Sequence, residues 1–163
     1  MDNLTKLTPV YARVRHLGAE FCVHEGWNLA DSFDSPEKEI TAACQGVAIA
    51  DESARGKLTM EGSTADEIVQ KSFGTLTREI GSGTLAHDVQ LYRLRPDKYY
   101  LDTPPGGEVK TMQSLTETAR GGSDLVTITD MTHGCTALRL IGPESVELLS
   151  QLCGLDFQAA SFH

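Results

Sequence analysis

The feature that most limits the possible folds is a short internal repeat. Residues 57–69 can be laid on residues 137–149, and both segments show the pattern of a strand, a glycine and then a helix. An aspartate, Asp51 or Asp130, stands shortly before each copy. A strand–helix unit exposes an apolar sheet face that it cannot bury alone. The repeat therefore predicts an α+β fold built from two related, pseudo-duplicated strand–helix units.

Alternation of apolar and polar residues, together with turn and cap signals, predicts the other elements. Strands are expected over 45–51, 57–61, 89–94, 99–101, 125–130 and 135–141, and helices around 64–73, 109–119 and 143–152. Residues 1–10 are expected to be a loose lead-in, and residues 11–163 to be a single domain, because the chain has the length of one domain.

The balance of charge excludes several classes of partner. The chain has 23 acidic and 14 basic residues, a formal net charge of −9. Such a surface repels phosphate backbones and anionic lipids, so we expect neither nucleic-acid nor membrane binding. The N-terminus lacks the basic and apolar stretches of a signal peptide, which favours a cytoplasmic location. The four cysteines form no Cys-x-x-Cys pair, so we expect small buried thiols rather than disulfides or a zinc site.

Three short motifs carry possible chemistry. Residues 81–86 imitate a dinucleotide-binding loop, but a strand is expected after the glycines instead of a helix, so a flexible loop is the better interpretation. His133 and Cys135 lack further metal ligands at a suitable spacing, which favours a turn and no metal site. His87 and Asp88 precede a strand, where a carboxylate could hold a cation or take a proton. From the residues alone, a solvated loop pair is the favoured reading of His87 and Asp88.

The first third of the chain resembles the glycine-cleavage T-protein, an aminomethyltransferase that uses tetrahydrofolate. That family has a Leu-Gly-Ala segment, a Gly-Trp pair, and then Gly-Val-x-Asp-x-Ser-x-x-Gly-Lys-x-x-x-x-Gly. The matching positions in this chain are 17–19, 26–27, 46–47, 51–57 and 62. Trp27 of the Gly-Trp pair is the sole tryptophan, and we expect it to anchor a core.

The second half is similar to the small gamma subunit of heterotetrameric sarcosine oxidase, a relative in the same superfamily. The segments that carry this similarity are 94–101, 103–106, 129–130, 138–144 and 155–157. Together the two resemblances cover about residues 11–157, and they imply the fold of the folate-binding N-terminal domain of T-proteins.

The resemblance also implies a site. T-proteins place an acidic residue of an Asp-Asp pair, just before a strand ending in Tyr-Arg-Leu, beside the folate and the migrating carbon. The matching positions are His87 and Asp88, followed by Tyr92. The resemblance therefore implies Asp88 as the catalytic carboxylate, which orients the folate amine or stabilises an iminium-like carbon, with His87, Asp88 and Tyr92 as cofactor-binding residues. One member of the pair is histidine instead of aspartate.

The resemblance leaves two functions open. The chain ends before the later Tyr-Thr-Gly-Glu-x-Gly segment of T-proteins, so we expect a C-terminally truncated relative. The first interpretation is tetrahydrofolate-dependent aminomethyl transfer or folate binding, with folate and a small amine-derived substrate as partners. The alternative is a non-catalytic structural subunit, like the gamma chain, packed against larger subunits of a flavoprotein complex. A folate-binding protein of the iron–sulfur repair type is a weaker third reading, because its Lys-Gly-Cys-Tyr-x-Gly-Gln-Glu signature is absent.

Overall fold

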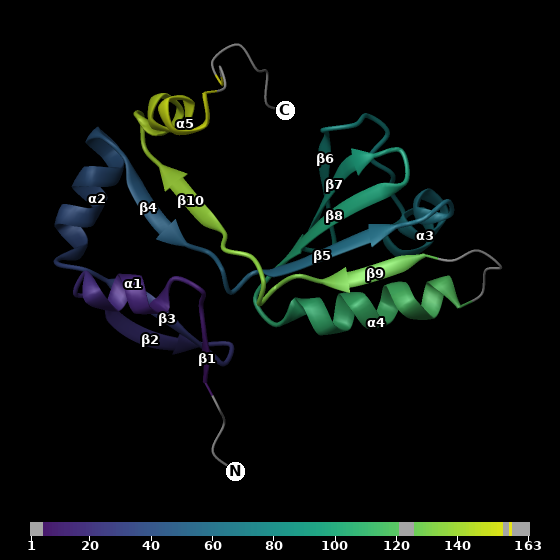
Figure 1. Cartoon of the computed structure of the whole chain (residues 1–163), viewed down its shortest axis with the longest axis horizontal. Coiled ribbons are helices and arrows are strands. Elements are labelled where there is room, and N and C mark those ends of the chain that lie inside the picture. The colour runs from purple at the N-terminus through teal and green to yellow at the C-terminus, as the bar shows by residue number, and fades with distance from the viewer. Residues whose placement is uncertain (1–4, 121–125, 155–156, 158–163) are drawn as a thin grey trace. The chain divides into compact units, whose positions relative to one another are not determined.

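The computed structural model describes residues 5–120, 126–154 and 157, and it shows a mixed α+β protein (Figure 1). The strands are β1 (Lys6–Leu7), β2 (Glu20–His24), β3 (Trp27–Ser32), β4 (Ala48–Asp51), β5 (Gly56–Glu61), β6 (Gly83–Ala86), β7 (Val89–Arg95), β8 (Lys98–Thr103), β9 (Thr127–Asp130) and β10 (Leu138–Ile141). The helices are α1 (Tyr11–His16), α2 (Pro36–Gln45), α3 (Ala65–Phe73), α4 (Gly107–Ala119) and α5 (Ser145–Cys153). The expected α+β class is confirmed.

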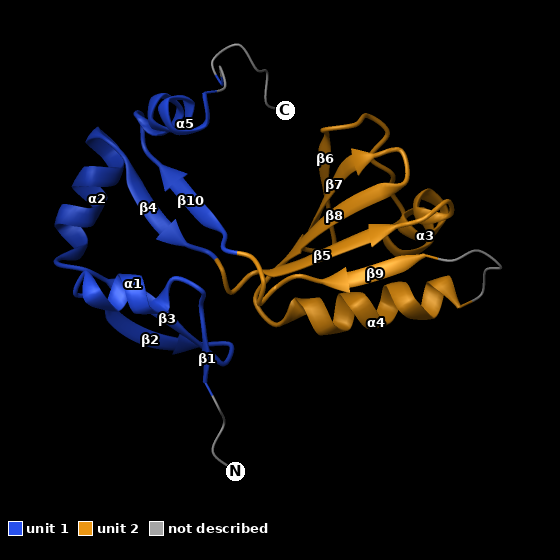
Figure 2. Ribbon diagram, viewed as in Figure 1, with its two compact units in different colours: residues 1–52, 136–163 blue, residues 53–135 orange. Residues whose placement is uncertain are grey.

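The chain packs as two compact units (Figure 2). Unit 1 consists of residues 1–52 and 136–163, and unit 2 consists of residues 53–135. Unit 2 is one continuous stretch of chain, whereas unit 1 is assembled from the two ends of the sequence. Each unit has its own sheets and helices.

Unit 2 contains a five-stranded antiparallel sheet in the order β6-β7-β8-β5-β9. Alternate residues of its strands point to one face, where α3 and α4 cover them. The buried core residues come from both helices and from three strands: Leu58, Met60, Ala65, Ile68, Val69, Val89, Leu91, Tyr99, Leu101 and Leu115. The other sheet face carries the polar and aromatic residues that build the candidate site.

Unit 1 contains two small sheets. In the first, β3 lies between β1, which is parallel to it, and β2, which is antiparallel. In the second, β4 and β10 form an antiparallel pair. Trp27, at the start of β3, has no exposed surface, which confirms it as a core residue. The Lys6 ammonium lies 5.3 Å from the centre of its ring, a cation–π contact.

The predicted repeat is present in the local structure. We call β5, Gly62 and α3 the first module, and β10, Gly142 and α5 the second module. In each module the glycine carbonyl accepts a hydrogen bond from the first helical amide, Ala65 at 3.1 Å and Ser145 at 3.2 Å. Both helices end at a glycine with left-handed backbone, whose amide donates a hydrogen bond to a carbonyl in the last helical turn. The two modules therefore follow the same local rules.

The two repeat aspartates pair with the opposite copies. Asp51 ends β4 and lies opposite Leu138 of the second module, and Asp130 ends β9 and lies opposite Leu58 of the first module. The residue after each aspartate donates its amide proton to the carbonyl of the residue before the paired leucine, Ala137 at 2.9 Å and Lys57 at 2.8 Å. Asp51 thus precedes the first module in sequence but is paired with the second, with the same register as its counterpart.

Several elements differ from those expected. Helices α1 and α2 and the β2–β3 hairpin were not predicted. A loop was expected at residues 81–86, but the last four of these residues form β6. A tight turn after Ala86 allows β6 to pair with β7. β10 begins at Leu138 and not at residue 135, since residues 132–134 form a turn. The start of the strand expected at 125–130 lies partly outside the described residues.

Candidate functional site

The pair His87 and Asp88 forms the tip of the β6–β7 hairpin. Ala86 pairs with Val89, so the two residues between them make up the whole turn. Both have positive φ, 50° and 66°, which is the signature of a type I′ turn. Both side chains are exposed. The Asp88 carboxylate makes no hydrogen bond or ion pair with any residue that the structure describes.

A second hairpin shows what this turn ordinarily contains. In the β2–β3 turn, Glu25 and Gly26 have φ of 49° and 77°, and His24 pairs with Trp27. Glycine at the second position takes the left-handed conformation without steric cost. Asp88 occupies that position in the β6–β7 turn, where left-handed backbone is less favourable for aspartate than for glycine, although aspartate tolerates it better than most residues with a Cβ. Strained residues of this kind gather at functional sites.

Tyr92 and Arg93, which follow the turn on β7, lie on opposite faces of the sheet. Tyr92 lies on the face opposite the helices, 6.0 Å from the ring of Tyr100 on β8, with 37° between the ring planes. The Tyr92 hydroxyl donates to Gln90 Oε1 at 2.7 Å. A Cβ at Gly83 would lie 2.8 Å from the Tyr92 ring, so only glycine leaves room for this ring on β6.

Arg93 points to the helix-covered face and supports the hairpin from below. Its guanidinium donates to Asp66 Oδ2 at 2.9 Å and to the Thr77 carbonyl at 3.1 Å. The Tyr99 hydroxyl donates to the other Asp66 oxygen at 2.6 Å. Burial, and then the hydrogen bond to Asp66, raise the pKa of Tyr99. These hydrogen bonds connect β7 and β8 to helix α3. They hold in place the two strands that carry Tyr92 and Tyr100 on the opposite face of the sheet.

A charged pair, Arg55 and Asp102, lies beside Tyr100 on the face of the sheet opposite the helices. Arg55 Nε donates to Asp102 Oδ1 at 2.7 Å, and both side chains are about one quarter or less exposed. Burial, and then the nearby Asp102 carboxylate, raise the pKa of Tyr100 to about 12. Tyr100 therefore stays protonated at neutral pH and can donate a hydrogen bond. We call Tyr92, Tyr100, Arg55 and Asp102 the open-face cluster.

The predicted site residues fall on one hairpin but in two environments. His87 and Asp88 are at its exposed tip, and Tyr92 is half-buried on β7. Sequence reasoning missed Tyr100, Asp102 and Arg55. Strand alternation in 98–103 was the available signal for Tyr100 and Asp102, because it places them on the same face as each other.

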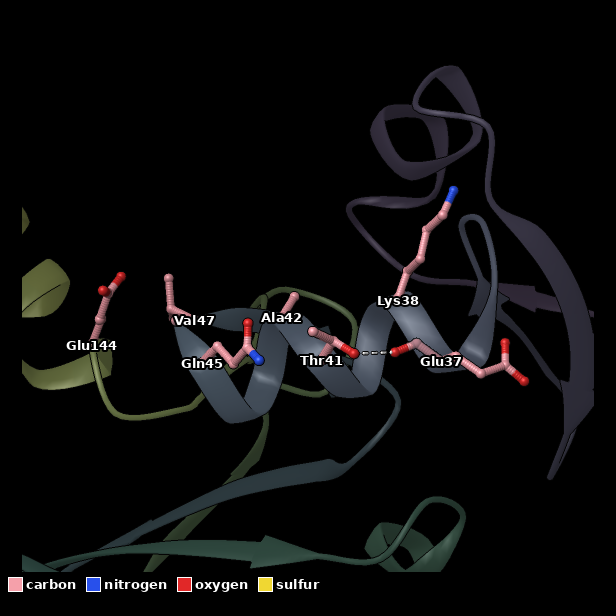
Figure 3. Close-up of a pocket in the computed structure, with 8 residues that line it drawn as sticks. Glu37, Lys38, Thr41, Ala42, Gln45, Val47 and Glu144 are labelled. Carbon is pink, nitrogen blue, oxygen red and sulfur yellow. Dashed lines mark hydrogen bonds between the residues drawn. The ribbon is translucent and has the colours of Figure 1, made fainter.

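Hollows among the described residues lie elsewhere. One of about 680 Å³ in unit 1 runs along α2 and is lined by Glu37, Lys38, Thr41, Ala42, Gln45, Gly46, Val47 and Glu144 (Figure 3). Another in unit 2, of about 290 Å³, lies beside α4 and includes Met112, Arg120 and Asp130. Neither is lined by His87, Asp88 or Tyr92.

The described residues lack both a cluster of metal ligands and a membrane-spanning helix. Across residues 5–120, 126–154 and 157, no group of three or more His, Cys, Asp or Glu side chains is placed to hold a metal ion. Within the same described residues, no helix has the length and apolar character needed to cross a bilayer.

Comparison with known proteins gives a consistent family signal. The family model for the GCVT N-terminal domain matches residues 10–163. The aminomethyltransferase of Herpetosiphon aurantiacus is 25% identical over 97% of this chain and 46% of its own length. That of Staphylococcus saprophyticus is 24% identical over 96% of this chain and 46% of its own length. The chain thus spans about half the length of the curated relatives it matches.

Solved structures share the fold. The glycine cleavage system aminomethyltransferase T of Bartonella henselae superposes with a TM-score of 0.84 at 22% identity, over 96% of this chain and 46% of that one. Heterotetrameric sarcosine oxidase from Corynebacterium sp. U-96 superposes with a TM-score of 0.54 at 18% identity, over 72% of this chain and 62% of that one. The arrangement of strands and helices is therefore the one found in the N-terminal part of an aminomethyltransferase.

Proposed function

The chain belongs to the GCVT N-terminal domain family, and from this premise we propose that it binds tetrahydrofolate and serves folate-dependent aminomethyl transfer in the cytoplasm. Its partners are folate and a small amine-derived substrate. The relatives named aminomethyltransferase are about twice as long as this chain.

One observation carries the proposal: an aspartate stands where a hairpin turn favours glycine. Asp88 has φ of 66° and an exposed carboxylate that makes no bond within the described structure. Neither packing nor hydrogen bonding accounts for this residue, and the backbone conformation is unfavourable for it. A role for the carboxylate toward a ligand accounts for both.

The open face suits the proposed ligand. Tetrahydrofolate, when bound, supplies the nitrogen that accepts the one-carbon unit. Its aromatic part requires an apolar or aromatic surface, which Tyr92 and Tyr100 provide. Asp88 accepts a hydrogen bond from a ligand N–H or holds a proton at its carboxylate. His87, beside it in the turn, is the second polar residue at the tip.

The test is calorimetric titration with tetrahydrofolate. We expect saturable binding that Asp88→Asn weakens roughly tenfold, because a charge-assisted hydrogen bond contributes about 1.5–3 kcal/mol. Glu25→Gln is the matched control, since it removes an exposed carboxylate from the equivalent turn of the β2–β3 hairpin. Asp88→Gly should weaken binding as well, while raising the stability of the hairpin. Equal affinities of wild type and Asp88→Asn would refute the role of Asp88.

A second candidate function rests on the likeness to heterotetrameric sarcosine oxidase. In that case the chain is a non-catalytic structural subunit packed against larger, flavin-bearing subunits. The absence of tetrahydrofolate binding at millimolar ligand, together with co-purification of a flavoprotein, would favour this function over the first.

A further inference from the structure

We propose that Arg55 is a carboxylate-binding residue, which holds the glutamate end of a folate on the open face of the unit 2 sheet. This inference rests on the proposed function and adds to it a residue that selects for the anionic part of the ligand.

The bonding of Arg55 leaves most of its guanidinium available. Its Nε donates to Asp102 Oδ1 at 2.7 Å, and this is the one hydrogen bond that the side chain makes with the described residues. The side chain is 24% exposed, and its two terminal nitrogens make no hydrogen bond with the described residues. Planar guanidinium groups bind carboxylates through two parallel N–H···O bonds. The bond to Asp102 fixes the orientation of the Arg55 guanidinium. It uses Nε, so the two terminal nitrogens can still form the paired bonds to a ligand carboxylate.

The backbone at Arg55 is also fixed. The Lys57 side chain is 2% exposed, and its ammonium donates to the carbonyls of Arg55 and Ser53, each at 2.8 Å. A buried ammonium therefore ties together the loop that carries Arg55. A binding residue held at both its backbone and its side chain loses little freedom when a ligand arrives.

The surroundings match an aromatic ligand with an anionic end. Arg55 and Asp102 lie close enough to Tyr100 for both charges to affect its pKa, and Tyr100 contacts Tyr92. The cations farther along the same face are already engaged, because Lys98 and Arg95 both pair with Glu61. A protein with a net charge of −9 repels anions over most of its surface. A local guanidinium with spare donors is what an anionic ligand requires here.

The experiment compares two ligands and three proteins by calorimetry. The ligands are tetrahydrofolate and its diamide, in which both glutamate carboxylates are neutral. Wild type should bind tetrahydrofolate roughly tenfold more tightly than the diamide, which corresponds to about 1.4 kcal/mol. Arg55→Gln should abolish this preference, so that the variant binds tetrahydrofolate and the diamide with the same affinity. Arg55→Lys should retain part of it, since an ammonium keeps the charge but not the fork.

Arg95→Gln is the control, because it removes an exposed arginine of the same sheet that is already paired with Glu61. It should keep the full preference for tetrahydrofolate. The inference is overturned if wild type binds both ligands equally, or if Arg55→Gln weakens both to the same extent, which is the result of a purely structural role. In either case the proposed function stands. If wild type binds neither ligand, the proposed function itself fails. The comparison of ligands on wild type needs no variant, so a folding defect in Arg55→Gln cannot obscure it.

Discussion

The two modules have the same local structure but very different burial. Leu58 of the first module has no exposed surface, whereas Leu138, at the matching position of the second, is 56% exposed. β5 has β8 on one side and β9 on the other, and among the described residues β10 pairs with β4 alone. The helix–glycine pattern is thus encoded locally, and burial depends on the strands and helices that surround it.

The helices repeat the contrast. Ile68 and Val69 of α3 are buried in the core of unit 2. The matching residues of α5, Leu148 and Leu149, are half-buried, and Leu152 is 72% exposed. Since α5 is the more apolar helix, its exposure reflects a shortage of neighbours within the described part of unit 1 and not a polar surface. The sequence repeat therefore predicts the local structure of each module but not how deeply the module is buried.

The largest expected difference between the modules is in the free energy of unfolding lost when their matching leucines, Leu58 and Leu138, are replaced by alanine. Leu58→Ala should lower the free energy of unfolding by about 2–5 kcal/mol, because it opens a cavity in a packed core. Leu138→Ala should change it by about 0.5 kcal/mol or less, as exposed substitutions do. Urea unfolding followed by far-UV circular dichroism measures both. Equal losses would show that β10 is covered in solution.

The next effect concerns the glycine that joins β10 to α5. A Cβ at Gly142 would clash with the Gly46 carbonyl oxygen and lie 2.7 Å from that of Ala43, and the φ of Gly142 is +126°. Gly142→Ala should destabilise unit 1 by about 2–4 kcal/mol, because backbone atoms cannot move aside as a flexible side chain would. Trp27 is buried in unit 1 and is the sole tryptophan, so its fluorescence reports this loss. An unchanged transition would mean that the close approach to α2 is absent in solution.

A smaller effect should be equal in the two modules. Gly74 and Gly154 end α3 and α5 with φ of +68° and +64°, and a Cβ at either position would meet open space. Alanine at each site should cost about 1 kcal/mol, which is the penalty of left-handed backbone alone. Thermal unfolding of the two variants tests this. Unequal costs would show that the modules differ locally as well as in their surroundings.

The smallest effect depends on pH and arises in unit 2. Tyr99 and Tyr100 have a raised pKa in the folded chain, about 12 for Tyr100 against an ordinary value of 10.0. Above pH 10 the unfolded chain loses these protons first, so the free energy of unfolding falls as the pH rises toward 12. Tyr100→Phe should make this fall less steep. Urea titrations at pH 8 and at higher pH measure it, and identical slopes in wild type and variant would contradict the assignment.

Sequence patterns sufficed for the elements whose signals are local. Alternation and turn residues predicted β7 and β8, and the observed turn is the expected one, with Pro96 and Asp97 between paired Arg95 and Lys98. The same reasoning predicted both modules. These elements combine a clear apolar period with glycine or proline at their ends, so that local preference and burial agree.

The missed elements have weak patterns. β2 is exposed along most of its length, so apolar alternation does not reveal it. α2 has no buried residue in the structure, although Ser35 caps it and Pro36 begins it, and these two residues were an available signal. α2 is also the least apolar of the four helices from α2 to α5, so apolar residues mark it only weakly.

The candidate site was predictable only in part. His87, Asp88 and Tyr92 came from family resemblance, and their role stays a prediction. The pairing of Arg55 with Asp102 joins residues 47 positions apart, and no spacing along the chain indicates it. Contacts of this kind depend on the register of β5 against β8, which places Lys57 opposite Asp102 and so brings the Arg55 loop beside it.

The pairing of β4 with β10 has a consequence for how the gene could be divided. The Glu52 amide lies 2.9 Å from the Ala137 carbonyl, so the chain leaves unit 1 and re-enters it at adjacent points of one antiparallel ladder. Unit 2 is therefore an insertion at what would otherwise be a hairpin loop. An Asn-Gly turn could replace the inserted segment and close the remaining strands directly, and the excised segment could be produced as a separate protein.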